Sequence, residues 1–374
     1  MENNNSVCFV ARINEIKPIE GADKIELAVI GGWNCIVQKG HYVENDLTIV
    51  ATTDAVIPQE LSDAMNVTSY LRKGQRVRTV KLRGVYSECL LIPLKHVPLM
   101  ENYYNGKDMM FTMNIYKYEP PARQVQLSSG RKIKYKDNEN FKVYYKFPNL
   151  KNVPELFTEN DKVEITRKIH GTNARYGIVK KNKLSIWDRV KRFFGNEWIE
   201  YEYVYGSHNV EKGSDTQGFY DTDVWRTIAE KYEIREKLWE FFKMQKENYE
   251  INEGLIIYGE IYGPGIQKGY EYGLKEISYS GFDVTINNEY RDTTISFIIQ
   301  GVFLELPYVE TLYNGNWSQE VQDSFVFNNF IEGTKVPHEG IVIKAVDGNR
   351  NKVAKVINPD YLIYGEKHNI GDSH

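Results

Sequence analysis

Cysteine is scarce in this sequence, and its arrangement excludes two common kinds of site. The 374 residues include three cysteines, Cys8, Cys35 and Cys89. They are odd in number, lie far apart and show none of the spacings by which cysteines bind zinc. We therefore expect neither a disulfide framework nor a zinc centre. Reduced structural thiols fit a cytosol-like compartment, so we expect a cytoplasmic protein.

Other familiar signals are also missing. No apolar run is long enough to cross a bilayer, and the polar start Met1-Glu-Asn-Asn-Asn-Ser does not resemble a signal peptide. The phosphate-binding pattern G-x-x-x-x-G-K-[ST] does not occur, and the seven histidines form no recognisable catalytic triad. We expect a monomer without a membrane partner.

Positive charge is not in excess, but it is concentrated in one segment. The chain has 47 Lys and Arg against 51 Asp and Glu, so a nucleic-acid partner would have to meet a local basic patch. Residues 70–86 carry six cations and no acid, with a tyrosine at each end. The six cations are Arg72, Lys73, Arg76, Arg78, Lys81 and Arg83. Two interpretations stay open from this segment alone: a groove that follows a phosphate backbone, or the solvated face of an edge strand.

The length of the chain predicts two domains. Residues 1–115 show short apolar or alternating runs separated by turn residues. The strands expected there lie near Val7–Ile13, Lys24–Ile30, Asn34–Gln38, Leu47–Thr52 and Val85–Ile92, with a turn at Gly31-Gly32. About five short strands in about a hundred residues predict a small β-barrel such as an OB-fold.

Residues 116–142 are polar, basic and rich in helix and strand breakers, which predicts a linker. Residues 143–374 mix strands and helices, so we expect an α+β protein with antiparallel sheets in this second domain. Its expected strands are Lys162–Arg167, Arg175–Val179, Tyr201–Tyr205, Gly254–Ile261, Ser278–Ile286, Gly340–Ala345 and Val353–Ile357. Its expected helices are Asp223–Asn248 and Ser318–Ile331, the second with Ser318 as N-cap and Gly333 as the stop.

The stretch from Glu164 to Arg175 is the first candidate for chemistry. An apolar strand pattern ends at Lys168, and Gly171 follows three residues later. A lysine at a strand end beside a glycine turn suits a nucleophilic amine, because glycine lets the backbone approach a bound group closely. His170, Asn173 and Arg175 could donate hydrogen bonds to phosphate oxygens. Taken alone, K-x-x-G is a weak signal, since most such tetrapeptides are ordinary turns.

Two acid–glycine pairs adjoin apolar strands further along the chain. Tyr258-Gly259-Glu260 ends one strand, and Glu339-Gly340 begins another that contains Lys344. The carboxylates could hold ribose hydroxyls or a hydrated metal ion. Lys355 follows in a later strand. Each element is common by itself, but this ordered combination is much rarer.

Two further motifs lie between Lys168 and Glu339. Tyr205-Gly206-Ser207-His208-Asn209 ends a strand with small and polar groups, which fit either a turn or a ribose or phosphate contact. Phe282-Asp283-Val284 places an aromatic ring in a strand. That ring could stack on a base, although a core phenylalanine is the more common outcome.

In this order, the motifs closely resemble those of the ATP-dependent RNA ligases, within the covalent nucleotidyltransferase superfamily. Lys168-Ile-His-Gly-Thr-Asn173 is similar to the nucleophile motif in its RNA-ligase form. Gly206 to Asn209, Tyr258 to Glu260, Phe282 to Val284, Glu339-Gly340 and Lys355 are similar to the motifs that follow it. The likeness runs from about Tyr145 to Tyr361, with His208 standing where relatives usually have arginine. The N-terminal module, including Lys81 to Ser87, resembles that of a nick-sealing subfamily that carries its OB domain first.

The resemblance implies a specific set of site residues. Lys168 would be the catalytic nucleophile. The residues implied for nucleotide binding are Ile169, His170, Gly171, Asn173, Arg175, Ser207, Glu260, Phe282, Glu339, Lys344 and Lys355. Glu260 and Glu339 would also hold a divalent metal, Mg²⁺ or Mn²⁺. The six cations of residues 70–86 would contact RNA.

The reaction implied is the joining of 3′-OH and 5′-phosphate ends through lysyl-AMP and an AMP-capped 5′-phosphate, with ATP as the nucleotide. Nicks with RNA on the 3′-OH side are the expected substrates. Alternatives left open are a capping-type guanylyltransferase, a DNA ligase, or a non-catalytic nucleic-acid-binding protein. The first two carry their OB domain after the last motif, whereas only 19 residues follow Lys355 here, too few for a barrel.

Overall fold

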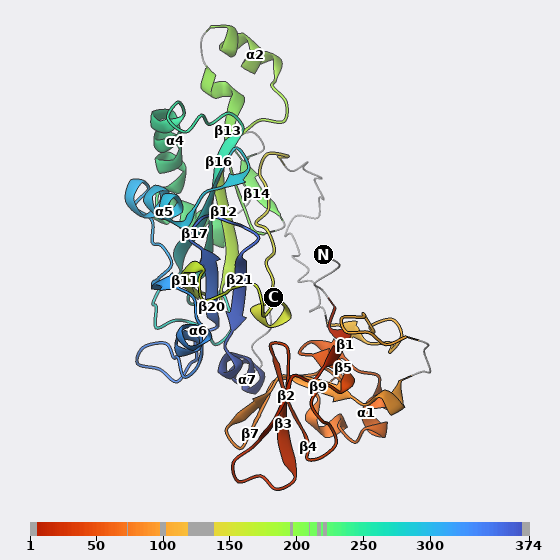
Figure 1. Cartoon of the computed structure of the whole chain (residues 1–374). Coiled ribbons are helices and arrows are strands. Elements are labelled where there is room, and N and C mark those ends of the chain that lie inside the picture. Colours follow the sequence, from red (N-terminus) through yellow and green to blue (C-terminus); the bar gives the residue numbers. More distant parts are fainter. Residues whose placement is uncertain are drawn as a thin grey trace.

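Antiparallel sheets build both halves of the chain. The computed structural model describes residues 6–72, 74–97, 102–118, 138–194, 197–208, 210–214, 218–219 and 223–368. Figure 1 shows a smaller N-terminal unit, coloured red to orange, beside a larger second unit coloured yellow-green to blue. The predicted α+β class with antiparallel sheets is confirmed. Within the described ranges, no helix has the length and apolar character needed to span a membrane.

The N-terminal unit consists of short strands around an apolar interior. Its strands are β1 (Cys8–Arg12), β2 (Glu15–Pro18), β3 (Ile25–Ile30), β4 (Trp33–Gln38), β5 (Leu47–Thr52), β6 (Ala55–Val56), β7 (Val80–Leu82), β8 (Val85–Ser87), β9 (Cys89–Ile92) and β10 (Tyr116–Lys117). They pair in the orders β1-β5-β9, β2-β3-β4, β7-β8 and β10-β6, and helix α1 (Gln59–Ala64) follows β6. The turn expected at Gly31-Gly32 does join β3 to β4, with Ile30 opposite Trp33.

Two sheets form the framework of the second unit. The four-stranded sheet has the order β19 (Thr311–Asn316), β11 (Lys162–Lys168), β20 (Gly340–Ala345) and β21 (Val353–Ile357). The seven-stranded sheet has the order β15 (Gly218–Phe219), β14 (Glu211–Ser214), β13 (Tyr201–Gly206), β12 (Thr172–Lys180), β16 (Gly254–Tyr262), β17 (Ser278–Ile286) and β18 (Glu289–Tyr290). The central strands β12, β16 and β17 are buried along most of their length because apolar clusters cover both faces of this sheet.

Both helices predicted for the second unit have different bounds in the structure, and the helices at 186–193, 293–297 and 359–367 are not among those predicted from the sequence. The helices of this unit are α2 (Ile186–Phe193), α3 (Val224–Lys231), α4 (Ile234–Gln245), α5 (Thr293–Phe297), α6 (Gln319–Val326) and α7 (Pro359–Lys367), with a short π-helical turn at Ile298–Phe303. The single helix expected at 223–248 is wrong, because Glu233 adopts a left-handed conformation (φ 53°) that separates α3 from α4. Ser318 caps α6 as predicted, but the helix ends at Val326, since Phe327 is extended, well before Gly333.

Residues at both ends of the predicted linker, 116–142, contact the neighbouring units. Residues 119–137 lie outside the described residues. Before them, β10 pairs with β6, which attaches residues 116–117 to the N-terminal unit. After them, the backbone N–H of Asn138 donates to Glu211 at 2.7 Å and its amide donates to Glu202 at 2.8 Å. Residues 138–142 therefore pack with the second unit.

Candidate active site

Lys168 lies at the point where the chain crosses from one sheet to the other. It is the last residue of β11, and Thr172 begins β12 in the seven-stranded sheet. The two strands do not pair with each other, so the K-x-x-G segment is a crossover rather than a hairpin turn. Across the first sheet Lys168 lies opposite Gly340, and across the second Asn173 lies opposite Glu260. The crossover thereby brings both acid–glycine motifs to the nucleophile candidate.

Two glycines are needed for this crossing because the backbones come very close. A Cβ atom at Gly171 would overlap the carbonyl oxygen of Ile261 on β16. Gly340 has φ +151°, and a Cβ there would overlap the carbonyl oxygen of Val356 on β21. The close approach explains why an acid–glycine pair, and not an acid alone, stands next to Lys168.

Lys168 and Glu339 form a direct ion pair. Their Nζ and Oε1 atoms lie 2.7 Å apart, and the side chain of Lys168 is 21% exposed while that of Glu339 is 1% exposed. A carboxylate held this way can orient the amine and can accept a proton from it. The side chain of Lys168 remains partly exposed, as a nucleophile for an external substrate requires.

Two titratable groups near Lys168, namely Glu260 and Lys355, have displaced pKa values. Burial raises the pKa of Glu260 to about 8, with Lys168 opposing and Glu339 adding to the shift. Burial lowers the pKa of Lys355 to about 8, with Lys168 adding to the shift and Glu339 opposing it. Glu260 on β16 and Lys355 on β21 are therefore each coupled to Lys168 at the end of β11 and to Glu339 just before β20. Displaced pKa values at converging charged groups are typical of functional sites.

His170 fixes the loop that follows the nucleophile. It is buried, and a ring nitrogen lies 3.1 Å from the hydroxyl of Tyr361 on α7. Its ring also packs edge-on against Tyr270, and its backbone N–H donates to the hydroxyl of Tyr272 at 2.7 Å. The histidine thus positions the crossover by contacts with three tyrosines.

Asn173 and Arg175 follow the crossover and have different surroundings. The Oδ1 atom of Asn173 is buried without a hydrogen-bond partner among the described residues, close to Glu260 on the neighbouring strand. Arg175 is also buried, and its guanidinium donates to the carbonyl oxygens of Ser207 (2.8 Å) and Phe141. Arg175 therefore joins β12 to the segment after β13, a position unlike the phosphate contact that the sequence predicts for it.

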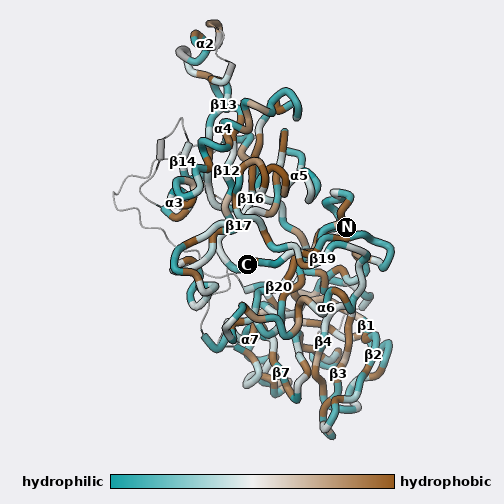
Figure 2. The backbone as a smooth tube through the Cα atoms, turned by 90° about the vertical axis from the view of Figure 1, so that its left-hand side faces the viewer, coloured by the Kyte–Doolittle hydropathy of each residue, from teal (hydrophilic) through white to brown (hydrophobic). Residues whose placement is uncertain are grey.

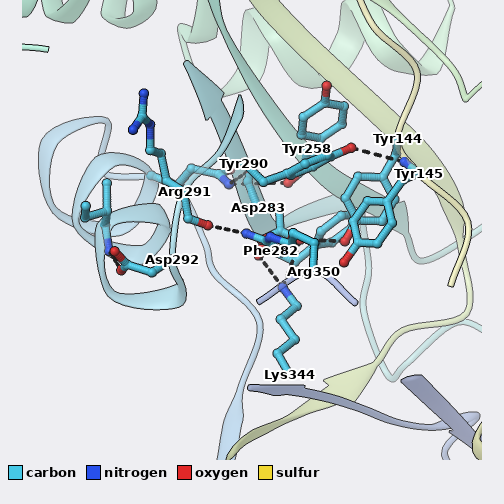
Figure 3. A network of polar contacts seen from close by, with 12 residues as sticks. Tyr144, Tyr145, Tyr258, Phe282, Asp283, Tyr290, Arg291, Asp292, Lys344 and Arg350 are labelled. Carbon is cyan, nitrogen blue, oxygen red and sulfur yellow. Dashed lines mark hydrogen bonds and ion pairs between the residues drawn. The ribbon is translucent and has the colours of Figure 1, made fainter. Parts of the chain in front are cut away.

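Phe282 and Lys344 belong to a second cluster, which Figure 3 shows. Lys344 Nζ lies 3.0 Å from Asp283 Oδ2 and donates to the carbonyl oxygen of Phe282 at 2.9 Å. Arg350 reaches the other carboxylate oxygen of Asp283 at 3.0 Å. The ring of Phe282 packs edge-on against Tyr144, with centroids 5.0 Å apart. Lys344 is thus held beneath Phe282 rather than beside Lys168.

Sequence reasoning assigned no role to Asp283, Arg350 or Tyr144. The aspartate was visible inside the Phe-Asp-Val motif, next to the residue chosen for stacking. Arg350 and Tyr144 carried no signal, because they meet Asp283 from loops 67 and 139 residues away in the chain.

The six cations predicted to bind nucleic acid do not share one open face. Arg76 is buried and pairs with Asp54 in its own unit. Arg78 lies 3.4 Å from Glu366, and Lys81 lies 3.6 Å from Asp360, so both meet acids of α7 in the second unit. The remaining members differ: Arg72 is half-buried, Arg83 occupies the exposed β7–β8 turn, and Lys73 lies outside the described residues.

The residues near Lys168 provide some, but not all, of the ligands that a divalent cation needs. Among the described residues no group of three or more His, Cys, Asp or Glu side chains gathers as a ligand cluster. Glu260 and Glu339 nevertheless provide two carboxyl groups, and burial is the main cause of the raised pKa of Glu260. Two carboxylates, the free Oδ1 of Asn173 and water molecules suit a hydrated hard cation.

Comparison with known families covers both units. Residues 7–94 match an OB-fold domain family, which confirms the fold predicted for the N-terminal unit. Residues 161–357, more than half of the chain, match the RNA ligase family. No curated protein sequence matches the chain significantly.

Solved structures of an RNA ligase from Naegleria gruberi share the whole architecture. The structure with PPi has a TM-score of 0.69 at 23% identity and covers 98% of this chain and 99% of its own. A mutant with ATP and Mn has a TM-score of 0.66 at 22% identity, covering 97% and 99%. Another mutant, with AMP and Mn, has a TM-score of 0.68 at 22% identity and the same coverage. The match of residues 161–357, which contain Lys168, Glu260, Glu339 and Lys355, establishes that this chain belongs to the RNA ligase family.

Proposed function

We propose that the protein is an ATP-dependent RNA ligase that joins 3′-OH and 5′-phosphate ends through lysyl-AMP and AMP-capped RNA. The observation that carries the proposal is the position of Lys168. Its side chain is partly exposed, its amine pairs with Glu339 at 2.7 Å, and it lies within the region that matches the RNA ligase family. The Naegleria gruberi structures with ATP and Mn, with AMP and Mn, and with PPi support ATP and a divalent ion as ligands here.

In the first step Lys168 attacks the α-phosphate of ATP and pyrophosphate leaves. The attacking amine must give up a proton, and Glu339 is the group placed to orient it and accept that proton. Lys355 lies within electrostatic reach of Lys168 and would neutralise charge on the α-phosphate. A divalent ion held by Glu260 and Glu339 would supply further charge neutralisation when bound.

The nucleotide would be held by the elements around this centre. Asn173, with its free Oδ1, would contact the ribose, a phosphate-bound water or the ion. Phe282 would stack on the base, and Lys344 and Asp283 would fix Phe282 by their contacts beneath it. Arg175 and His170 would act as positioning residues, since their contacts are with protein groups.

Self-adenylylation tests the first step directly. The protein is incubated with α-labelled ATP and a divalent metal, denatured and separated. Wild type should retain label and Lys168→Ala should not, while Lys162→Ala, an exposed lysine on the same strand, should label like wild type. Label in Lys168→Ala would remove the nucleophile assignment. Labelling by GTP instead of ATP would indicate a capping-type enzyme, and no labelling of wild type would favour a non-catalytic binding protein.

The preferred substrate is proposed to be a nick with RNA on the 3′-OH side. Four nicked duplexes, with RNA or DNA on each side of the break, separate the possibilities. Sealing should require RNA at the 3′-OH side and tolerate DNA at the 5′-phosphate side. Equal sealing of an all-DNA nick would contradict this preference without affecting the assignment of Lys168.

A further inference from the structure

A basic arm with two exposed aromatic rings projects from the far end of the seven-stranded sheet. The arm comprises residues 180–194, between β12 and β13, and contains α2. Figures 1 and 2 show it extending beyond the sheet, at the end opposite the N-terminal unit. The helix begins with a reciprocal cap, because the Ser185 hydroxyl accepts from the N–H of Asp188 and the Asp188 carboxylate accepts from the N–H of Ser185, both at 3.0 Å.

The tip of the arm exposes an apolar surface. Phe193 is 86% exposed, Phe194 is 80% exposed, and Val190, one turn earlier, is 41% exposed. The two rings contact each other edge to face, with centroids 5.7 Å apart. Two adjacent phenylalanines this exposed would be costly in water without a partner.

Several cations lie close to these rings in the sequence. The exposed cations of the arm are Lys180, Lys183, Arg189 and Lys191. Arg189 precedes Phe193 by four residues and Lys191 precedes Phe194 by three, spacings that place each cation and ring on one side of the helix. Asp188, the acid within α2, lies 3.6 Å from Lys181. The described part of the arm therefore presents excess positive charge beside its aromatic rings.

We propose that this arm is an RNA-contact surface that stacks unpaired bases on Phe193 and Phe194 and holds the adjoining phosphates with its cations. Exposed aromatic rings interleaved with cations are the combination that binds single-stranded nucleic acid. The inference rests on the proposed function, which makes RNA the substrate. It adds a contact outside the site of Lys168 and outside residues 70–86.

The geometry of β12 sets the reach of the arm. This strand runs from Thr172, beside the nucleophile, to Lys180 at the base of the arm, a span of about 26 Å at ~3.3 Å per residue. An RNA bound at both places must cover that span. A very short RNA can engage the arm or the active site, but not both.

A membrane surface is the competing occupant for a basic helix with apolar residues. The arm offers one short segment of two helical turns with three exposed apolar side chains. Stable membrane attachment requires two anchoring signals, and this segment provides at most one. An RNA already held near Lys168 would bind the arm intramolecularly, so weak stacking there would suffice. These considerations favour RNA.

The experiment compares two variants of the full chain. Phe193→Ser/Phe194→Ser removes the stacking surface, and Phe111→Ser removes a 99% exposed phenylalanine from the N-terminal unit as the matched control. Binding of a fluorescent RNA of about 20 nucleotides is measured by anisotropy, without ATP. The double variant should bind at least about tenfold more weakly than wild type, and Phe111→Ser should bind like wild type. With an RNA of roughly four nucleotides the difference should shrink or vanish.

Two further measurements complete the test. Lys183→Glu/Lys191→Glu should weaken binding of the longer RNA and reduce its dependence on salt concentration. Self-adenylylation should stay within twofold of wild type in every variant, because the arm lies far from Lys168. If wild type itself does not become labelled, that result counts against the proposed function and not against the arm.

Unchanged RNA affinity in Phe193→Ser/Phe194→Ser, or an equal loss in Phe111→Ser, would overturn the proposal. So would phenylalanine-dependent binding to phosphatidylserine vesicles, or phenylalanine-dependent self-association, in place of RNA binding.

Discussion

Two lysine–carboxylate pairs have their lysines on the neighbouring strands β11 and β20, and they differ in how many protein partners surround the carboxylate. Lys168 and Glu339 are 2.7 Å apart, with the lysine side chain 21% exposed. Lys344 and Asp283 are 3.0 Å apart, with side chains 4% and 0% exposed. In the second pair Arg350 and the hydroxyl of Tyr144 also bind the aspartate.

We infer that the difference separates the proposed site for chemistry from a cluster that supports Phe282. Around Lys168, the pKa values of Glu260 and Lys355 are both displaced to about 8, mainly by burial. Around Asp283, two cations and a phenol saturate one carboxylate inside an aromatic cage. A polyanionic nucleotide with a bound cation can add partners to the first group, whereas both carboxylate oxygens of Asp283 already have protein partners.

The largest effect is expected from Lys168→Met. Removal of the nucleophile should abolish covalent labelling by ATP, a loss of more than about 1,000-fold. The midpoint of thermal unfolding should fall, because the buried carboxylate of Glu339 loses its cation, although relief of the charge repulsion between Lys168 and Lys355 offsets part of this loss. Labelling and calorimetry of the same preparation check both statements. Retained labelling in Lys168→Met would show that Lys168, like Lys344, is not the nucleophile.

Lys344→Met should act on stability instead. It leaves Asp283 with one cation fewer in a dry environment, and breaking a buried pair in this way typically costs about 3–5 kcal/mol. Urea unfolding should reveal the loss. The exposed Lys335→Met, from the loop before β20, serves as the control. A loss below 1 kcal/mol, together with lost labelling, would place Lys344 among the chemical residues.

Lys355→Met should separate stability from activity. Because the folded pKa of Lys355 is about 8 and its ordinary value is 10.5, the buried ammonium destabilises the fold in full below about pH 8. Its replacement should therefore stabilise the protein at pH 7, and this gain should fade as the pH rises from about 8 to 10.5. Labelling should fall by about 100- to 1,000-fold.

Unfolding free energies of wild type and Lys355→Met across that pH range test the sign. A gain that grows with pH would contradict the assigned burial of the charge.

The smallest effect is expected from Tyr361→Phe. It removes one hydrogen bond to His170, worth about 0.5–1.5 kcal/mol, and loosens the crossover after Lys168. Labelling should fall severalfold. Tyr364→Phe, whose ring packs against Tyr270 from the same helix, is the matched control. Equal effects of the two substitutions would show that His170 needs no hydroxyl partner.

Much of the framework could be predicted from short-range patterns. The strands at Ser278–Ile286, Gly340–Ala345 and Val353–Ile357 were predicted with the bounds that the structure has, because apolar β-branched runs between turn residues leave few alternatives. The break at Glu233 was missed, since apolar periodicity continues through it. A single left-handed residue leaves no periodic signal.

By itself, the sequence determined the order of the motifs and the pairing of each acid with a glycine, Gly259 beside Glu260 and Gly340 beside Glu339; crowding at both glycines admits no side chain. Only the tertiary structure decided which charges remain available. It placed Arg78 and Lys81 against acids of α7, buried Arg175 among carbonyl groups, and enclosed Lys344 with Asp283. The sequence sets which residues are charged. Which of these charges are neutralised depends on partners far away in the chain, and only folding brings those partners together.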